Sequence, residues 1–495
     1  MLGNRVLAGA VWLVGARLST RVLDLLAMLI VARILSPQDF GLFALASTTL
    51  LILNAASDLS LSNALIQMKD PPAEAYDTAF TLGVLRGAAI AALLAASAWP
   101  LAAIYADPRL IPVTLAIAAA PFARGFVSPR MADFDRALNF RPAFIVEAGA
   151  KAATFVVSIA IAFVFENYWA LIGAVIASAV MSTALSYFFA PYQPKLKLSH
   201  WRPIFSFSGW LAVGQTVSTL NMQADRFFVG KSLGVPALGQ YSLGNTLASL
   251  PTEATVAPMM QALYAGFSKL THDLPRFRAA YLSAQSIVMS VAMPMGFLAS
   301  ALAYPIIELT LGDKWREAAF VIMVLAPVIS LQILTTAAQS VCMATGRTRE
   351  IFVRDVLALS VRLPLIFIGL YLGGFHGVVW ARVISGLVFI FLNVQIVTKI
   401  LGISLAEQIR TPWRSIASSL AMVAVLVPVQ ILLPFSSDTL RLFVEIAFSA
   451  VLGTGVYLSC HAGLWLLSGK PAGPERRLVD LLARLLGPGR RAASP

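Results

Sequence analysis

Charged residues are scarce in this sequence. Asp, Glu, Lys and Arg together make up 12% of its 495 residues, whereas a soluble domain carries about 25%. Hydrophobic residues make up 58%. Most of the chain must therefore face lipid or other apolar helices. The net charge of +13 would suggest nucleic acid as a partner in a soluble protein, but these charges fall between apolar runs and indicate membrane topology instead.

Cysteine and histidine are also rare. The two cysteines, Cys342 and Cys460, lie inside apolar runs and are too few for a disulfide framework. The four histidines are scattered, and no Gly-rich loop followed by Lys and Ser or Thr could hold nucleotide phosphates. We therefore expect no metal, no other cofactor and no ATP hydrolysis by this chain. No connection between apolar runs exceeds about 15 residues, which disfavours an enzyme such as a polymerase or ligase.

Long apolar runs fill the chain. A membrane-spanning helix needs about 20 mostly apolar residues, and on that basis the sequence predicts an all-α integral membrane protein with about 14 helices. The runs are too uniformly apolar for barrel strands, which alternate lipid-facing and lumen-facing side chains. The predicted helices cover residues 9–34, 40–65, 77–104, 109–129, 142–165, 168–190, 204–230, 237–263, 279–304, 316–343, 350–372, 375–398, 413–434 and 440–468.

Two pairs of matching stretches indicate an internal duplication. Residues 31–45 match residues 229–243 in turn residues as well as apolar ones, and residues 141–178 match residues 348–385 without a gap. Both offsets are close to 200 residues, which predicts a duplicated unit of roughly that length. Each copy would hold six helices, so both copies enter the bilayer with the same polarity. They would form two lobes related by a pseudo-two-fold axis along the membrane normal, with a cavity between them.

The predicted domain organisation follows from this repeat. Two helices and a tail follow the lobes, and the tail's apolar and basic faces predict an interfacial helix on the anionic inner leaflet. The predicted boundaries are 1–200 for the N-terminal lobe (helices 1 to 6), 201–402 for the C-terminal lobe (helices 7 to 12), 403–470 for helices 13 and 14, and 471–495 for the basic amphipathic tail.

The distribution of Lys and Arg predicts the orientation. With both termini in the cytoplasm, about 22 basic residues fall on the inner side and about 5 on the outer side, which is the usual bias of membrane proteins. The opposite orientation would reverse this bias. The sequence therefore predicts a multi-pass protein of the cytoplasmic (inner) membrane with cytoplasmic N- and C-termini.

Several charged residues interrupt the apolar runs. A charge at mid-bilayer costs at least about 2.5 kcal/mol, so it usually faces a wet cavity or a partner. Cations outnumber carboxylates at these positions, and a cavity lined by them would attract an anion, with Arg geometry suited to phosphate. The candidate substrate-binding cations are Arg17, Arg21, Arg86, Lys151, Arg226 and Arg362. The carboxylates that could couple a proton or a sodium ion are Asp24, Asp58 and Asp225.

The same residues also have structural interpretations. Arg17, Arg21 and Arg86, which lie deeper in their predicted spans, could pair with Asp24 or Asp58. Glu147 and Lys151, four residues apart on one predicted helix, could neutralise each other. Asp225 and Arg226, which are adjacent in the seventh predicted helix, point to different faces and could each pair with a residue elsewhere.

Three motifs, in order along the chain, resemble those of a known family. They are Ser36–Phe43 (SPQDFGLF), Arg136–Arg141 (RALNFR) and Asp225–Lys231 (DRFFVGK). On these motifs the chain is identified as a member of the polysaccharide-transporter (O-antigen/exopolysaccharide flippase-like) branch of the multidrug/oligosaccharidyl-lipid/polysaccharide flippase superfamily.

The resemblance implies a V-shaped, two-lobed helical transporter. Its substrate would be a short oligosaccharide on undecaprenyl diphosphate, flipped from the inner to the outer leaflet by alternating access for exopolysaccharide, O-antigen or capsule biosynthesis. The diphosphate would meet the cavity arginines while the lipid tail stays in the bilayer. Expected partners are this substrate and membrane lipids, with polymerase and glycosyltransferase proteins of the pathway as candidates and no nucleic acid. A multidrug or other cation-coupled antiporter of the same fold is the alternative, and it would want an acidic cavity.

Overall fold

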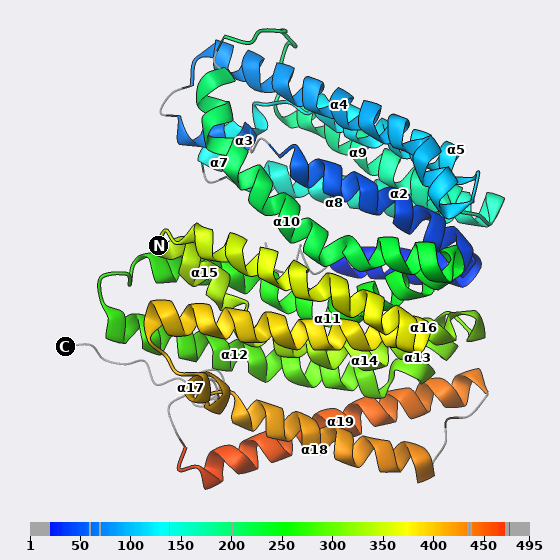
Figure 1. Cartoon of the computed structure of the whole chain (residues 1–495), viewed down its shortest axis with the longest axis vertical. Helices are drawn as coiled ribbons and strands as arrows, with labels where there is room; N and C mark the ends of the chain where they lie inside the picture. Colours follow the sequence, from blue (N-terminus) through cyan, green and yellow to red (C-terminus); the bar gives the residue numbers. More distant parts are fainter. Residues whose placement is uncertain are drawn as a thin grey trace, which may run out of the picture. The chain divides into compact units, whose positions relative to one another are not determined.

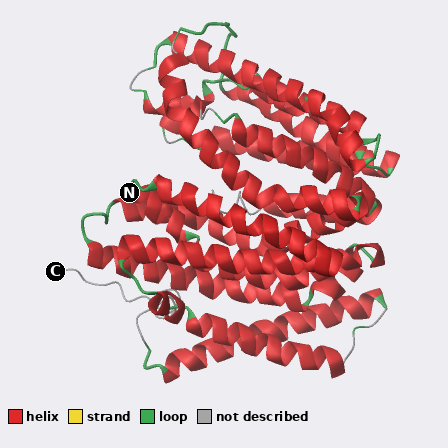
Figure 2. Ribbon diagram, in the orientation of Figure 1, coloured by secondary structure: helices red, strands yellow, loops and turns green. Residues whose placement is uncertain are grey.

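The computed structural model describes residues 20–470 except 59, 60, 69, 70, 138, 200, 433, 434, 436 and 437, and it also describes Glu475. Figure 2 shows helices joined by loops, and none of the described residues lies in a strand. The predicted all-α fold class is confirmed. Nine helices in the described ranges are long and apolar enough to cross a membrane, and a shorter apolar helical stretch covers Leu110–Gly125. The exact number of about 14 predicted spans is not confirmed.

The described residues form two compact units. Unit 1 contains the described residues up to Leu243, together with Thr310–Trp315 and Asp355–Val378. Unit 2 contains Gly244–Leu309, Arg316–Arg354 and the described residues from Val379 onward. These boundaries differ from those of the lobes expected from the sequence, whose division stays a prediction.

Unit 1 begins with a helix over residues 20–34. It continues with α2 (Pro37–Ala56), α3 (Leu61–Gln67), α4 (Ala73–Tyr105), α5 (Leu110–Ile117), α6 (Ala119–Gly125), α7 (Met131–Arg136), α8 (Arg141–Phe165), α9 (Trp169–Phe189), α10 (Trp201–Leu233) and the start of α11 (Val235–Ser268). The 3₁₀ helix η1 (Asp313–Trp315) and part of α16 (Thr348–Leu401) also belong to it. Within this unit α8 packs along α9 and α2 packs along α10, as Figure 1 shows.

Unit 2 contains most of α11 and the remaining parts of α16. Its other elements are α12 (Leu274–Ala301), α13 (Ala303–Thr310), α14 (Arg316–Gln332), η2 (Ile333–Thr335), α15 (Ala337–Ala344), α17 (Leu405–Arg410), α18 (Trp413–Leu432) and α19 (Thr439–Leu467). Helix α12 packs against α14 and α18, and α18 packs against α19.

Most predicted apolar runs correspond to one helix, but some are divided. The run 40–65 becomes α2 and α3, and the run 109–129 becomes α5 and α6. The runs 350–372 and 375–398 form the single element α16, in which Gly374 has non-helical backbone angles (φ 53°, ψ −126°). These angles interrupt the helix, so the predicted break between the two runs is confirmed. Glycine suits this position because few other residues adopt a positive φ.

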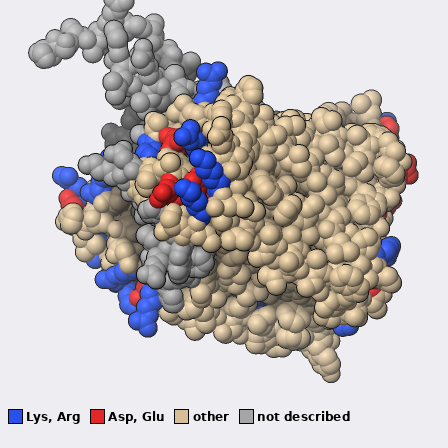
Figure 3. Space-filling model, turned by 90° about the horizontal axis from the view of Figure 1, so that it is seen from above, with Lys and Arg blue, Asp and Glu red and all other residues tan. Residues whose placement is uncertain are grey.

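Charged side chains are distributed unevenly over the surface. In the view of Figure 3 most Lys, Arg, Asp and Glu side chains gather at one edge, and the broad surface beside them carries few charges. A surface with few charges is what a membrane-embedded helical protein presents to lipid.

Helices α2 and α11 touch at two glycines. A Cβ atom added at Gly41 would clash with the carbonyl oxygen of Val235, and one added at Gly239 would clash with the carbonyl oxygen of Pro37. The duplication sets Gly41 on Gly239 and Pro37 on Val235, so each contact is the image of the other. A two-fold axis between duplicated segments produces this reciprocity.

Replacing either glycine by alanine should therefore destabilise the protein. We expect Gly41→Ala and Gly239→Ala each to lower the free energy of unfolding by about 1–3 kcal/mol, because the two backbones would have to separate. Thermal unfolding of the purified protein in detergent measures the change. Gly214→Ala in α10 is the matched control, since a Cβ at Gly214 meets no atom within 4 Å. If all three variants unfold at the same temperature, the close crossing is wrong.

Candidate functional site

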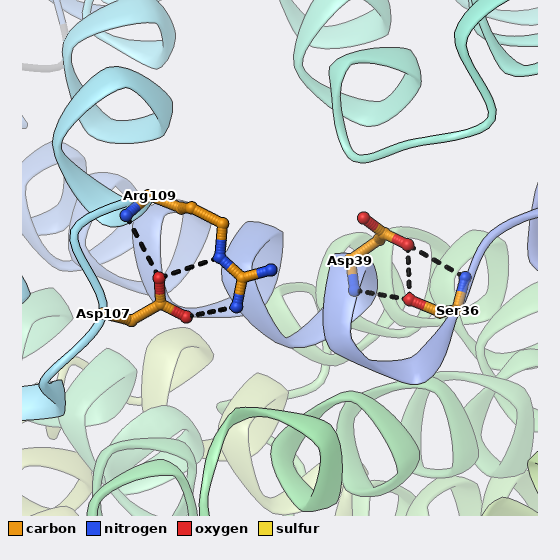
Figure 4. A network of polar contacts seen from close by, with 4 residues as sticks. All are labelled: Ser36, Asp39, Asp107 and Arg109. Atoms are coloured by element: carbon orange, nitrogen blue, oxygen red, sulfur yellow. Dashed lines mark hydrogen bonds and ion pairs between the residues drawn. The ribbon is translucent and has the colours of Figure 1, made fainter.

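The first sequence motif forms the start of α2. The Ser36 side chain accepts a hydrogen bond from the Asp39 backbone N–H at 3.3 Å, and the Asp39 carboxylate accepts one from the Ser36 N–H at 3.0 Å (Figure 4). This capping box satisfies N–H groups that a helix start would otherwise leave unbonded. The second oxygen of Asp39 accepts the Tyr168 N–H at 3.1 Å, which ties the motif to the start of α9. The motif therefore has a structural role.

Asp107 and Arg109 form a second polar contact at the turn between α4 and α5. The Arg109 guanidinium donates to both carboxylate oxygens of Asp107, at 2.9 and 2.7 Å (Figure 4). These hydrogen bonds hold the pKa of Asp107 below its usual value. The turn thus carries a pair with no net charge.

The candidate residues of the first helix lie in different surroundings. Arg17 lies outside the described residues, and Arg21 is exposed. Asp24 pairs with Lys151 of α8, with 2.8 Å between Oδ2 and Nζ, and both side chains are partly exposed. Lys151 therefore reaches another helix for its partner, whereas Glu147, the partner considered on its own helix, is exposed.

Asp225 and Arg362 form a buried ion pair. The distance between Oδ2 and Nη2 is 2.8 Å, and the two side chains are 4% and 5% exposed. The Tyr241 hydroxyl donates to the same carboxylate oxygen. The contact joins α10, α11 and α16, which helps explain why residues 355–378 belong to unit 1. Removing one partner of such a pair leaves an uncompensated buried charge.

Arg86 of α4 binds the end of α2. Its guanidinium donates to the backbone oxygen of Asn54 at 3.0 Å and to the Ser57 hydroxyl at 3.3 Å. Asn54 lies in the last turn of α2, where backbone oxygens lack helical partners and a cation is favourable. The negative charge of Asp58 also acts on Arg86. Arg86 is thus half-buried with a structural role at a helix end.

Arg226 of α10 also contacts α2. Its Nη1 donates to the hydroxyl of the buried Thr48 at 3.4 Å, a long bond. Among the described residues neither Arg86 nor Arg226 forms an ion pair, whereas Lys151 and Arg362 each do. The roles of all four in substrate binding stay predictions, and the structure gives Arg226 the weakest structural explanation.

Both ion pairs join equivalent helices of the two copies. Asp24 and Lys151 join the first and fifth predicted helices of the first copy, and Asp225 and Arg362 join the first and fifth of the second. In the repeat alignment Asp225 lies three residues after the counterpart of Asp24, and Arg362 lies four residues after the counterpart of Lys151. Both shifts are about one helical turn. Each copy therefore has an acid–base pair between the same helices, one turn apart.

The structure adds functional groups that the sequence reasoning did not select. Thr48 binds Arg226 and Tyr241 binds Asp225, both of α10. Tyr241 corresponds to Phe43 in the duplication, and Asp225 corresponds to Ala27. A hydroxyl and a carboxylate therefore occur together in the second copy and are both absent from the first. This paired difference between the copies indicates that Tyr241 and Asp225 contact each other. Within the described ranges no group of His, Cys, Asp and Glu side chains could hold a metal ion.

Comparison with known proteins decides the family. The family described as "Polysaccharide biosynthesis protein" matches residues 30–320. The chain belongs to this family. The family resemblance inferred from the three motifs is thereby confirmed.

Two relatives show how far the similarity extends. The chain is 24% identical over 425 residues to the lipopolysaccharide biosynthesis protein WzxC of Escherichia coli, covering 83% of this chain and 85% of WzxC. It is 26% identical over 336 residues to the succinoglycan biosynthesis transport protein ExoT of Rhizobium meliloti, covering 66% of each.

Solved structures share the fold. The lipid II flippase MurJ in an inward closed conformation superposes with a TM-score of 0.72 at 13% identity, covering 91% of this chain and 98% of MurJ. An inward-facing multidrug resistance MATE family transporter of the MOP superfamily superposes with a TM-score of 0.60 at 13% identity, covering 82% and 98%. At this identity the likeness shows the fold alone. The chain is a multi-pass membrane protein of this helical class.

Replacing one residue of the buried ion pair should destabilise the protein more than replacing both. We expect Asp225→Leu or Arg362→Met alone to lower the free energy of unfolding by about 3–5 kcal/mol, because each leaves a buried charge without its counter-ion. The double variant should be more stable than either single variant. Thermal unfolding in detergent measures all three.

Tyr241→Phe is a control in the same contact, since it removes one hydrogen bond and no charge. If the double variant loses as much stability as the two single losses combined, Asp225 and Arg362 do not stabilise one another.

Proposed function

We propose that this protein is a flippase for lipid-linked oligosaccharides. It moves repeat units carried on undecaprenyl diphosphate from the inner to the outer leaflet of the cytoplasmic membrane, for the biosynthesis of a surface polysaccharide. Its family, the biosynthetic role of WzxC and the transport role in the name of ExoT support this proposal. The protein acts as a transporter rather than as an enzyme.

The proposal rests on two arginines of predicted membrane spans, Arg86 and Arg226, that form no ion pair among the described residues. Arg86 and Arg226 are half-buried and bind only hydroxyl or backbone oxygen atoms. A charge within the membrane is costly and usually serves a substrate pathway. A guanidinium presents up to five N–H donors in a fixed plane, and these match the oxygens of a phosphate. We assign the diphosphate of the substrate first to Arg226, and to Arg86 only if it leaves the end of α2 during the transport cycle.

The remaining predicted cations have a secondary place in the proposal. Lys151 and Arg362 would bind the substrate only if they left Asp24 and Asp225 during the transport cycle. Arg21, and Arg17 before it, would extend the basic lining along the first helix. The lobes 1–200 and 201–402 would open alternately to the two sides of the membrane. Both termini would be cytoplasmic, and polymerase and glycosyltransferase proteins would act with the flippase.

The multidrug antiporter is the alternative, and the carboxylates disfavour it. Asp24 and Asp225 are each bonded to a basic side chain, and Asp58 lies near Arg86. A carboxylate bonded to Lys or Arg, as Asp24 and Asp225 are, attracts a cationic drug or a coupling ion weakly. The roles of these three residues in cation coupling stay predictions of that alternative.

Neutralising Arg226 should impair transport without unfolding the protein. We expect Arg226→Gln to lower the rate of flipping of the undecaprenyl-diphosphate-linked repeat unit by about tenfold or more, because a charge-assisted contact to phosphate is lost. Arg226→Lys should keep part of the rate, since the charge remains but the paired donors do not. The measurement uses the full chain in proteoliposomes, with the oligosaccharide exposed on the outer leaflet detected by a lectin.

Arg276→Gln is the matched control, because Arg276 is 80% exposed and pairs with Asp273 at the start of α12. Thermal unfolding of each variant reports on folding. Flipping at the unaltered rate by well-folded Arg226→Gln and Arg86→Gln variants would contradict the assigned phosphate contacts. Export of cationic drugs with no flipping would favour the antiporter.

A further inference from the structure

Unit 1 contains a cavity away from the intramembrane arginines. It has a volume of about 430 Å³ and lies between the start of α4, the loop before α7 and the segment after α9. Ligand sites of proteins commonly enclose about 300–1,000 Å³. The lining residues are Ala73, Tyr76, Asp77, Arg130, Pro191, Tyr192, Gln193 and Lys195.

The acidic groups around this cavity are already bonded to its aromatic wall. The Tyr192 hydroxyl donates to the buried Asp77 carboxylate at 2.6 Å, and the Tyr76 hydroxyl donates to Asp133. Burial and the contact with Asp77 raise the pKa of Tyr192 to about 12, so the phenol stays neutral. The two rings therefore form a fixed, uncharged wall whose hydroxyls are committed to carboxylates.

The basic groups of the cavity are in the opposite situation. Arg130 and Lys195 are exposed at its rim, and neither forms an ion pair with any described residue. The neighbouring Lys197 differs, because its ammonium lies 3.9 Å from the Glu74 carboxylate. The Gln193 amide also lines the cavity and can donate or accept. Two cations, an amide and two neutral rings suit an anion that carries a small polar group.

We infer that this cavity binds a phosphate ester through Arg130 and Lys195, with its polar organic part against Tyr76, Tyr192 and Gln193. Both basic residues lie in loops that the distribution of Lys and Arg predicts to be cytoplasmic. At that surface a phosphate ester can come from an anionic phospholipid headgroup or from a soluble compound. The site is distinct from the proposed substrate arginines and does not depend on the proposed function.

The test uses the full-length protein in nanodiscs and in detergent. Binding of phosphatidylglycerol is measured by native mass spectrometry, and binding of free glycerol phosphate by isothermal titration. We expect the double variant Arg130→Gln/Lys195→Gln to bind its phosphate ligand about tenfold more weakly than the unaltered chain, since two charge-assisted contacts are lost. Ala73→Phe should weaken binding as well, because it fills the cavity without changing the charge.

The control double variant Arg124→Gln/Lys269→Gln removes two exposed cations that do not line the cavity. It should bind as tightly as the unaltered chain. Loss of phosphatidylglycerol binding alone in the cavity variants identifies a lipid, and loss of glycerol phosphate binding identifies a soluble ester. Equal binding by the cavity and control variants overturns the inference. So does normal binding by Ala73→Phe, because the effect of the charges would then be general.

Discussion

The structure of unit 1 depends on neutralising charge where water is scarce. Asp225 and Arg362 are almost fully buried and are held together with Tyr241, so three helices meet at one contact. Isolated, either charge would cost several kcal/mol. The pair Asp24 and Lys151, which is partly exposed, joins the corresponding helices of the other copy, one turn away. The duplication has thus kept the helices that an ion pair joins and changed the residues that form it.

This constraint separates the candidate residues. Arg86 has a structural task, because it satisfies an oxygen in the last turn of α2. Arg226 has only a long bond to Thr48, although it lies beside the buried ion pair of Asp225 and Arg362. A cation with so weak a structural contact in a predicted membrane span is best explained by a ligand. The arginine next to Asp225 is therefore the residue on which the assignment of a phosphate-bearing substrate depends most.

The helices could be predicted from the sequence, but their ion pairs could not. The apolar runs and the break at Gly374 depend on local composition, and both were visible. Glu147 was considered as the partner of Lys151 because residues four positions apart on one helix share a face. Its actual partner, Asp24, lies on another helix, and which turns of two helices lie side by side depends on packing across the whole unit. The pairing of Arg362 with Asp225 likewise depends on how α10 and α16 pack.

The crossing at Gly41 and Gly239 has a consequence for how such a chain could arise. Each glycine contacts the residue that corresponds to the other glycine's partner, so one copy carries both halves of the contact. A chain of half this length could therefore have formed the same crossing with a second molecule of itself, before gene fusion joined the two. In a fused chain each half can change its charged residues independently, which a symmetric homodimer cannot do, and the two ion pairs differ in this way.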